Sequence, residues 1–296
     1  MTRSWLFVPG DSDEKLTKSE SVPADALILD LEDSVRPEYK SAARLQVSEF
    51  LSDHSKERKR PLWVRVNRLA QHELDADLES VMHGRPDGIV LPKAESPLEV
   101  SFLGKRLETR ELALGIPPGA TRIIPLTTET PRSLFTLANY TEGDPRLAGL
   151  TWGAEDLCAA IGAQSNREPD GSWSHPFQLA RSLCLFAAHA AGVDAIDTVY
   201  TGIRDSVGLN VACQRARRDG FTGKLAIHPT QVEVINKAFT PSDEEFARAQ
   251  QIVELYAAQP GAGVLDLDGT MLDLPHLIQA RRIVAMANRW GSNSNG

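Results

Sequence analysis

The 296-residue sequence predicts an α/β fold in which eight parallel strands close into a (β/α)8 barrel, followed by a C-terminal helical appendage. Three observations lead to this prediction: eight short β-rich runs recur along the chain, most of them are continuously apolar, and amphipathic stretches separate them. Continuous apolar runs are typical of parallel strands that are covered on both faces. Eight alternations of strand and helix favour a closed barrel over an open doubly wound sheet.

The predicted strands are short, and no Gly-x-Gly-x-x-Gly motif follows the first one, which argues against a dinucleotide-binding domain. The strands are residues 4–8, 26–31, 62–66, 88–91, 122–126, 148–152, 195–200 and 224–227. Amphipathic helices are predicted between them at residues 40–51, 74–82 and 177–191. In the last of these helices, Leu179, Leu183 and Phe186 recur at helical spacing.

A separate C-terminal segment follows the eighth strand. It comprises a predicted helix over residues 243–257, a break rich in Pro and Gly, and a final helix over residues 274–288. The final helix has an apolar face that needs a surface to cover. We therefore predict a barrel domain of residues 1–240 and an appendage of residues 241–296 that packs on a neighbouring subunit.

Composition excludes several classes of protein. The net charge is −8 and no basic block occurs, so nucleic acid and anionic membrane surfaces are not expected partners. No apolar run reaches the roughly 18 residues that a membrane span requires, and the N-terminus lacks the pattern of a signal peptide. Cys158, Cys184 and Cys213 have no metal-type spacing, which predicts packing residues in a reducing cytoplasm.

The carboxyl ends of the predicted strands carry many acids and few bases. Chemistry in such barrels takes place at these ends. Converging carboxylates repel one another unless a cation lies between them, and Mg2+ prefers oxygen ligands and keeps exchangeable waters. A single histidine does not make a zinc site. In chain order the polar residues are Asp30, Glu32, Asp33, Arg65, Asn67, Lys93, Glu129, Glu155, Asp156, Asp205 and His228.

The stretch "LAGLTWGAEDLCAAIG" places Gly153, Ala154 and two acids where an apolar run stops. Exposed amides at Gly153 and Ala154 can bind an anion, and Arg65 can hold a carboxylate with two parallel hydrogen bonds. A metal, an arginine and free amides together describe a site for a 2-keto acid. In this interpretation Asp156 is a metal ligand.

Three of these residues also have a purely structural interpretation. Glu129 could simply begin a helix, because Thr130 can cap it and Pro131 suits the first helical position. Asp156 could be a helix cap, and Arg65 could be a structural ion-pair partner.

The other candidates are equally open to two interpretations. Lys93 could form a Schiff base, although an acid cluster of the metal-binding type makes that role redundant. His228 opens a helix and could serve either packing or function, and one acid among Asp30, Glu32 and Asp33 could be only a cap.

Seven segments resemble, in order, those of the citrate lyase beta subunit and the HpcH/HpaI aldolase family, which includes malyl-CoA and citramalyl-CoA lyases. The resemblance covers nearly the whole chain, and several long motifs in the same order make it specific. The segments are "RSWLFVPG", "DALILDLEDSV", "VRVN", "LPKAES", "WGAEDL", "GFTGKLAIHPTQVEVIN" and "GTMLDLP".

The resemblance implies a TIM-type barrel, Mg2+ dependence and cleavage of a 3-hydroxyacyl thioester into an acyl thioester and a 2-keto acid. It implies that Glu129 and Asp156 bind the metal and that Arg65 contacts the substrate. Asp273, in "GTMLDLP", matches an aspartate that reaches into a neighbouring subunit's site, and we expect it to transfer protons. The family often forms trimers, so a homotrimer is expected.

The thioester partner leaves two alternatives. The chain could be a lyase for free coenzyme A thioesters, with Arg3, Lys15 and Lys18 near the first strand end meeting the phosphates. It could instead be the beta subunit of a citrate lyase complex that acts on an acyl-carrier-protein thioester. The barrel motifs are common to both.

Overall fold

The computed structural model describes residues 2–55, 57–142 and 144–290. The chain divides into two compact units, one of residues 2–235 and another that begins at Asn236. The division falls inside helix α8 (Pro229–Phe239), close to residue 240, where the sequence analysis placed the boundary. No helix in the described ranges is both long and apolar enough to cross a membrane.

The first unit is a barrel of eight parallel strands in the order β5-β4-β3-β2-β1-β8-β7-β6. Parallel bridges from Ile123 to Leu147 and from Leu126 to Thr151 join the two end strands, so the predicted (β/α)8 barrel is confirmed. The strands are β1 (Ser4–Pro9), β2 (Ala26–Asp30), β3 (Leu62–Arg65), β4 (Gly88–Leu91), β5 (Arg122–Pro125), β6 (Gly149–Thr151), β7 (Asp194–Asp197) and β8 (Gly223–Ala226).

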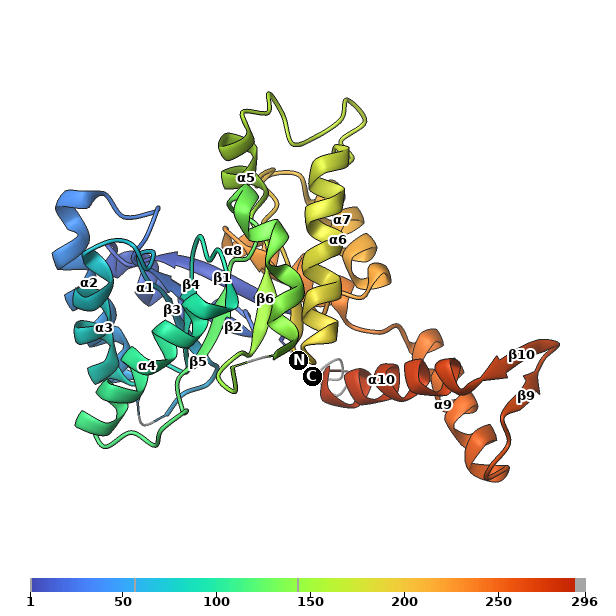
Figure 1. The fold of residues 1–296 in the computed structure, drawn as a ribbon. Helices are drawn as coiled ribbons and strands as arrows, with labels where there is room; N and C mark the ends of the chain where they lie inside the picture. Colours follow the sequence, from blue (N-terminus) through green and yellow to red (C-terminus); the bar gives the residue numbers. More distant parts are fainter. Residues whose placement is uncertain (1, 56, 143, 291–296) are drawn as a thin grey trace. The chain divides into compact units, whose positions relative to one another are not determined.

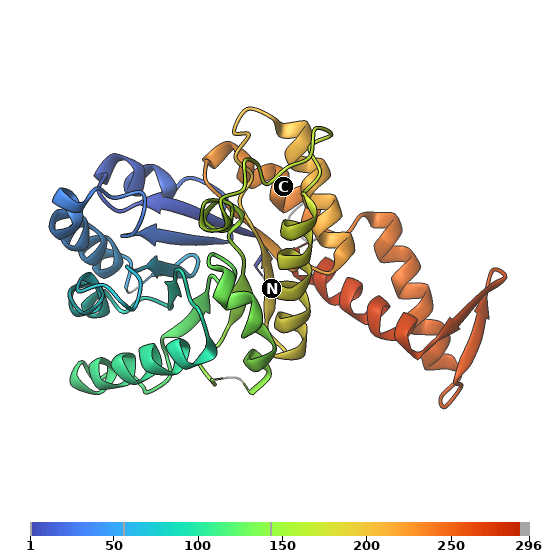
Figure 2. The ribbon, with the colours of Figure 1, turned by 45° about the horizontal axis from the view of Figure 1, so that its top comes forward.

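Helices surround the strands, with α1–α4 on one side of the barrel unit and α5–α7 on another (Figures 1 and 2). The crossover from β5 to β6 departs from the predicted alternation, because it contains two 3-10 helices, η3 (Pro131–Phe135) and η4 (Leu137–Glu142). The other helices are α1 (Asp13–Ser19), η1 (Pro37–Tyr39), α2 (Lys40–Asp53), α3 (Glu73–Val81), η2 (Met82–Gly84), α4 (Pro97–Ala113), α5 (Ala154–Ile161), α6 (His175–Ala190) and α7 (Ser206–Asp219).

Large side chains from several strands pack together in the barrel. The indoles of Trp5 and Trp63 meet edge to face with ring centroids 5.4 Å apart. A Cβ on Gly88 would lie 2.1 Å from the Trp63 ring, so β4 begins with glycine because the indole lies against it. The buried cluster comprises Trp5, Ala26, Ile28, Trp63, Val90, Ile124, Leu126, Ile196 and Leu225.

A buried ion pair also joins three strands, although the apolar pattern did not predict it. Lys224 of β8 lies 2.7 Å from Asp197 of β7, and the indole N–H of Trp152, just after β6, donates to the same carboxylate. Burial would raise the pKa of Asp197, but the Lys224 ammonium, the Arg181 guanidinium and the Trp152 N–H together outweigh it and the pKa is lowered. The carboxylate is therefore ionised, and its contacts tie β6, β7 and β8 together.

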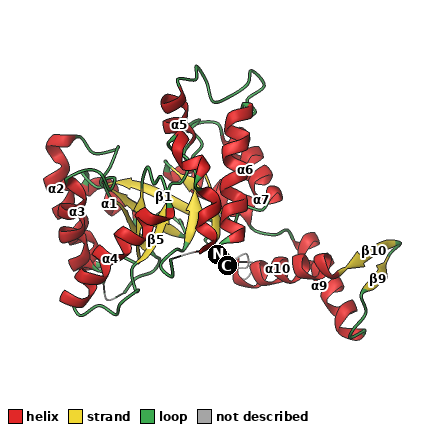
Figure 3. Cartoon of the chain, in the orientation of Figure 1, coloured by secondary structure: helices red, strands yellow, loops and turns green. Residues whose placement is uncertain are grey.

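The second unit contains two helices and a hairpin (Figure 3). Helix α9 (Asp243–Ala258) begins with a capping box, and α10 (Leu274–Trp290) closes the described chain. Between them, β9 (Val264–Leu267) and β10 (Thr270–Asp273) pair antiparallel, so the predicted structureless break is wrong at these residues. The turn is Asp268-Gly269 with φ of 55° and 77°, and this Asp-Gly pair between apolar residues is the hairpin signal that the sequence analysis missed.

Candidate active site

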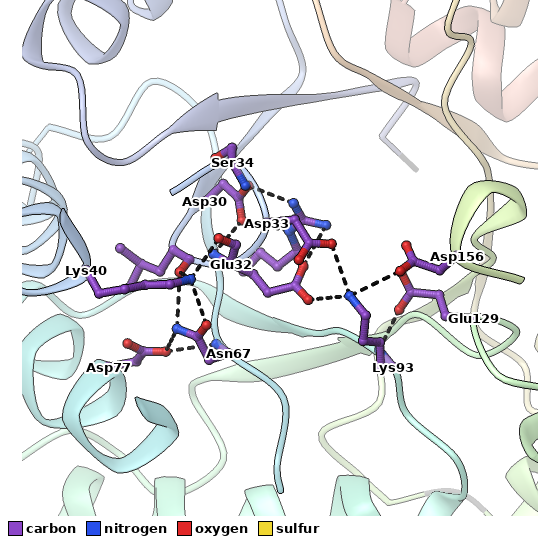
Figure 4. Close-up of polar contacts among 12 residues, drawn as sticks. Asp30, Glu32, Asp33, Ser34, Lys40, Asn67, Asp77, Lys93, Glu129 and Asp156 are labelled. Carbon is purple, nitrogen blue, oxygen red and sulfur yellow. Dashed lines mark hydrogen bonds and ion pairs between the residues drawn. The ribbon is translucent and has the colours of Figure 1, made fainter. Parts of the chain in front are cut away.

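The carboxyl ends of β2, β4, β5 and β6 bring charged side chains together (Figure 4). Glu32 and Asp33 follow β2, Lys93 follows β4, Glu129 follows β5, and Asp156 lies in the first turn of α5 after β6. The Lys93 ammonium lies 2.5 Å from Glu32, 3.0 Å from Asp33 and 3.3 Å from Asp156. Because parallel strands all end at one rim, residues far apart in the sequence meet at a single ammonium.

Glu129 is buried at this rim. Its Oε2 accepts a hydrogen bond of 2.5 Å from the backbone N–H of Lys93. Burial, and then the neighbouring carboxylate of Asp156, raise the pKa of Glu129 to about 8. A cation placed between Glu129 and Asp156 would relieve this repulsion and restore the ionised carboxylate.

Glu129 does not serve as the cap of the segment that follows it. The Thr130 hydroxyl accepts from the Ser133 amide, and Pro131 occupies the first position of η3. The predicted Thr130 cap and first-position Pro131 are therefore confirmed, and the Glu129 side chain lies with the acid cluster.

Asp156 is not a helix cap either. The N-cap of α5 is Gly153, which has no side chain, and Asp156 lies two residues beyond the first helical position. The adjacent Glu155 accepts from Asn166 of the following loop, at 2.9 Å. The two neighbouring acids therefore have different environments, and Asp156 is the one beside Lys93.

Gly153 is required at its position for a steric reason. A Cβ at this position would lie 2.5 Å from Cγ of Glu129, so the glycine makes room for the Glu129 side chain. The Gly153 amide donates to the Thr128 hydroxyl at 3.2 Å, so this amide already has a partner. Ala154, the buried first residue of α5, lies in the first turn, where amides have no intrahelical acceptor.

Arg65 uses its paired donors within the protein. Nε and Nη2 each donate to Asp30 at 2.7 Å, and Nη1 lies 3.1 Å from Glu32. Burial would raise the pKa of Asp30, but the Arg65 guanidinium outweighs it and the pKa is lowered. In this arrangement Asp30 takes both donors and Nη1 contacts Glu32, so the predicted two-bond hold on a substrate carboxylate would require Arg65 to release Asp30.

Lys40 supports the loop after β2, although the sequence analysis did not single it out. Its ammonium donates to the carbonyls of Leu31 and Glu32 at 2.6 and 2.8 Å and to Asn67 Oδ1 at 2.8 Å. Asn67 in turn donates to Asp77 of α3. A lysine at the start of an amphipathic helix gives no sequence signal of this role.

Arg3 lies at the wrong end of the barrel for the predicted thioester role. It precedes β1, so it lies at the amino end of the strands, where it donates to both carboxylate oxygens of Asp25 at 2.9 Å. Lys15 and Lys18 lie on α1, which follows the carboxyl end of β1, and both are exposed. Lys18 pairs with Glu14 at 2.5 Å.

A pocket of about 570 Å³ lies at the ends of β7 and β8. His228 is half-buried in its wall, with Nδ1 2.8 Å from the Thr230 hydroxyl, so the functional interpretation of His228 remains open. Asp205 caps α7 and also accepts from Tyr200, which makes it a structural residue. The lining residues are Ile203, Arg204, Ser206, Leu209, His228, Thr230 and Gln231.

Asp273 ends β10 in the second unit. Its Oδ1 lies 2.5 Å from Nδ1 of His276, and the two side chains are 40% and 44% exposed. The sequence analysis named Asp273 but missed His276. The spacing Asp-x-x-His at the start of a helix places the two side chains on one face and was the available signal.

The acid cluster suits Mg2+. Within the described residues, no group of three or more His, Cys, Asp or Glu side chains is arranged to hold a metal, so a metal here would be held by fewer than three of these side chains. Arg65 and Lys93 are the cations in ion-pair contact with the cluster. The cluster therefore retains surplus negative charge, and two carboxylates plus waters are a common Mg2+ arrangement. The acids are Asp30, Glu32, Asp33, Glu129 and Asp156.

A Schiff-base role for Lys93 does not fit the site. Burial would lower its pKa, but the carboxylates of Glu32, Glu129 and Asp33 together outweigh burial and the pKa is raised. A Schiff-base lysine needs a lowered pKa, so that the neutral amine can attack a carbonyl.

The cysteines occupy packing positions. Burial raises the pKa of both Cys184 and Cys213 to about 12, and all three thiols are free. A raised pKa disfavours the reactive thiolate.

The sequence is similar to those of known carbon–carbon lyases. Residues 3–229 match the HpcH/HpaI aldolase/citrate lyase family, and residues 177–292 match the C–C bond lyases of the TIM-barrel fold. The chain is 34% identical to the citrate lyase subunit beta of Escherichia coli K12 over 98% of this chain and 94% of the relative. It is 32% identical to the mitochondrial citramalyl-CoA lyase of Rattus norvegicus over 96% of this chain and 86% of the relative.

A solved structure is similar along its whole length. The protein CitE from Mycobacterium tuberculosis, in complex with magnesium, acetoacetate and coenzyme A, is 32% identical. It superposes with a TM-score of 0.79 over 97% of this chain and 98% of the other. Fold, acid cluster and sequence agree, and the chain belongs to the HpcH/HpaI aldolase/citrate lyase family of carbon–carbon lyases.

Proposed function

We propose that the protein is a Mg2+-dependent lyase that cleaves a 3-hydroxyacyl thioester, of the malyl-CoA, citramalyl-CoA or citryl type, into an acyl thioester and a 2-keto acid. The observation that carries this proposal is the pair Glu129 and Asp156 at the barrel rim, where burial and the Asp156 carboxylate raise the pKa of Glu129 and a cation would stabilise its ionised form. Relatives named citramalyl-CoA lyase and citrate lyase subunit beta support the reaction class.

Glu129 and Asp156 would hold the Mg2+. When bound, the cation supplies Lewis-acid polarisation of the oxygen that becomes the keto group. The Nη1 of Arg65, which Asp30 does not use and which lies 3.1 Å from Glu32, and the first-turn amide of Ala154 would orient the carboxylate of an anionic product. The magnesium and acetoacetate bound to the tuberculosis protein support this choice of ligands.

Asp273 would carry the proton transfers. In the cleavage direction it takes the proton of the substrate hydroxyl, the carbon–carbon bond breaks, and the electron pair leaves as a thioester enolate. The same proton then goes to the enolate carbon, so that protons and electrons balance. Asp273 would complete the site of a neighbouring subunit in a homotrimer.

The pocket beside His228 would take the thioester arm. β8 pairs with β1, so this pocket and helix α1, with Lys15 and Lys18, belong to adjacent sectors of one rim. Its mixed apolar and polar lining suits a pantetheine chain, and the lysines suit phosphates. The coenzyme A bound to the tuberculosis protein supports a thioester of this kind. The reducing cytoplasm would keep the three thiols free.

A second candidate is a beta subunit that acts on a thioester of an acyl carrier protein, favoured by the Escherichia coli relative. The test incubates purified protein, Mg2+ and a panel of acyl-CoA thioesters with glyoxylate, pyruvate or oxaloacetate, and follows condensation products. A parallel arm supplies the same acyl groups on an acyl carrier protein. Product from the carrier arm alone would select the second candidate, and no product in either arm would reject both.

A further inference from the structure

Lys93 has a backbone conformation that side chains rarely adopt. Its φ is +53°, in the left-handed region that favours glycine and asparagine. Among the described residues other than glycine, only Arg85, the C-cap of η2, and Asp268, in the hairpin turn, share a positive φ, whereas Lys93 lies in the turn that follows β4. A strained residue at a charged site points to a role for its side chain.

The two ends of Lys93 reach different acids. Its amide donates to Glu129, while its ammonium lies between the acids after β2 and the first turn of α5 (Figure 4). The shorter ammonium contacts, 2.5 and 3.0 Å, are to Glu32 and Asp33, and the longer one, 3.3 Å, is to Asp156. Glu32 and Asp33, which lie outside the proposed metal site, therefore hold the ammonium beside Asp156, which belongs to that site.

We propose that the Lys93 ammonium is an internal counter-ion that holds Asp156 in the absence of the cation and competes with the cation for that carboxylate. The inference rests on the proposed Mg2+ site. Glu32 and Asp33 keep the ammonium in place when the cation arrives, so the two positive charges repel. Lys93 thus stabilises the acid cluster before binding and lowers its affinity for Mg2+, which leaves the cation exchangeable.

The decisive variant is Lys93→Met, which keeps the length and the backbone strain of the side chain but removes its charge. Mg2+ dissociation constants are measured by calorimetry on the full chain at low salt and pH 8.5, above the pKa of about 8 of Glu129. We expect Lys93→Met to bind Mg2+ on the order of tenfold more tightly, with a smaller difference at high salt. Lys93→Arg keeps the charge and should remain close to the wild type.

The opposite end of the same strand offers a matched control. Arg85 precedes β4, carries the same charge and has the same φ of 53°. Arg85→Met should leave the Mg2+ affinity unchanged, which excludes effects of net charge and of strain. Lys93→Gly, which relieves the strain, should tighten binding like Lys93→Met and serves if the methionine variant does not fold.

The outcomes separate two kinds of failure. Weaker or unchanged Mg2+ binding in both Lys93→Met and Lys93→Gly, beside a wild type that binds, would reduce Lys93 to a structural support and overturn the inference. A wild type that binds no Mg2+, and whose heat signal does not change in Glu129→Gln, would instead overturn the metal site itself.

Discussion

The two groups of residues proposed for the reaction differ in how they are held. Glu129 is almost fully buried, with 3% of its surface exposed, and its neighbours are fixed by strand ends and by Lys93. Asp273 lies at the end of a hairpin in the second unit, 40% exposed, with His276 as its hydrogen-bond partner. The barrel thus preassembles a charged site, whereas the proposed proton-transfer group is carried by a separate unit. Binding and proton transfer can therefore be removed independently.

The largest effect is expected for Asp273→Ala. Loss of a positioned acid–base group reduces turnover by roughly 100- to 10,000-fold, while Mg2+ affinity stays at the wild-type value because the barrel acids are untouched. Steady-state kinetics and calorimetry measure the two quantities. Asp268→Asn in the same hairpin is the matched control, since asparagine tolerates its positive φ and its carboxylate has no proposed role.

The same variant tests assembly. Mixing Asp273→Ala subunits with Glu129→Ala subunits should restore activity, because a mixed oligomer contains sites with both intact residues. Absence of rescue, in oligomers proven to have exchanged subunits, would place Asp273 within its own chain's site or outside the reaction.

Glu129→Gln and Asp156→Asn should affect the metal site of the barrel, the other region in the comparison. Each keeps the shape of the side chain and removes a charged ligand, and we expect Mg2+ to bind about 100-fold more weakly. Glu155→Gln is the control, because Glu155 is exposed and bonds to Asn166 of the following loop and not to Lys93. If Glu155→Gln weakened Mg2+ binding as much as Asp156→Asn, the ligand assignment would be wrong.

The pH dependence of Mg2+ binding follows from the raised pKa of Glu129. A carboxyl with a pKa of about 8 is mostly protonated at pH 7, and the cation must displace that proton. Affinity should therefore rise by about tenfold per pH unit up to pH 8 and level off above it. The slope should disappear in Glu129→Gln, and a slope that persists there would assign the proton to another group.

Arg65→Lys should have a moderate effect. A lysine cannot make the paired contact with Asp30 and still present a third donor, so we expect keto-acid affinity to fall about tenfold with Mg2+ affinity roughly unchanged. Titration of pyruvate into the Mg2+-loaded protein measures the keto-acid affinity. Equal keto-acid affinity in both proteins would leave Arg65 with the structural role alone.

The sequence predicted features that depend on local pattern. Apolar runs located all eight strands, and the position of Glu129 and Asp156 after two of them placed both at one rim. The left-handed backbone of Lys93 and the two hydrogen bonds from Arg65 to Asp30 depend on contacts between elements distant in sequence. The periodicity of the sequence carries no information about such contacts. The hairpin around Asp268-Gly269 was predictable from turn chemistry, but the surrounding Pro and Gly residues led to the prediction of a break.

The smallest effect is expected for replacing His276, which contacts Asp273. This replacement tests how much each proposed acid depends on the side chains that hold it. The barrel acids have several partners, whereas Asp273 has an exposed hydrogen-bond partner, and exposed polar pairs contribute little. His276→Ala should lower turnover about three- to fivefold without changing Mg2+ affinity, and His276→Asn, which keeps an N–H donor near the Nδ1 position, should recover much of it. In an Asp273→Ala background, His276→Ala should have no further effect, because the imidazole acts through that carboxylate. An equal loss in both backgrounds would mean that His276 stabilises the start of α10 and does not position Asp273.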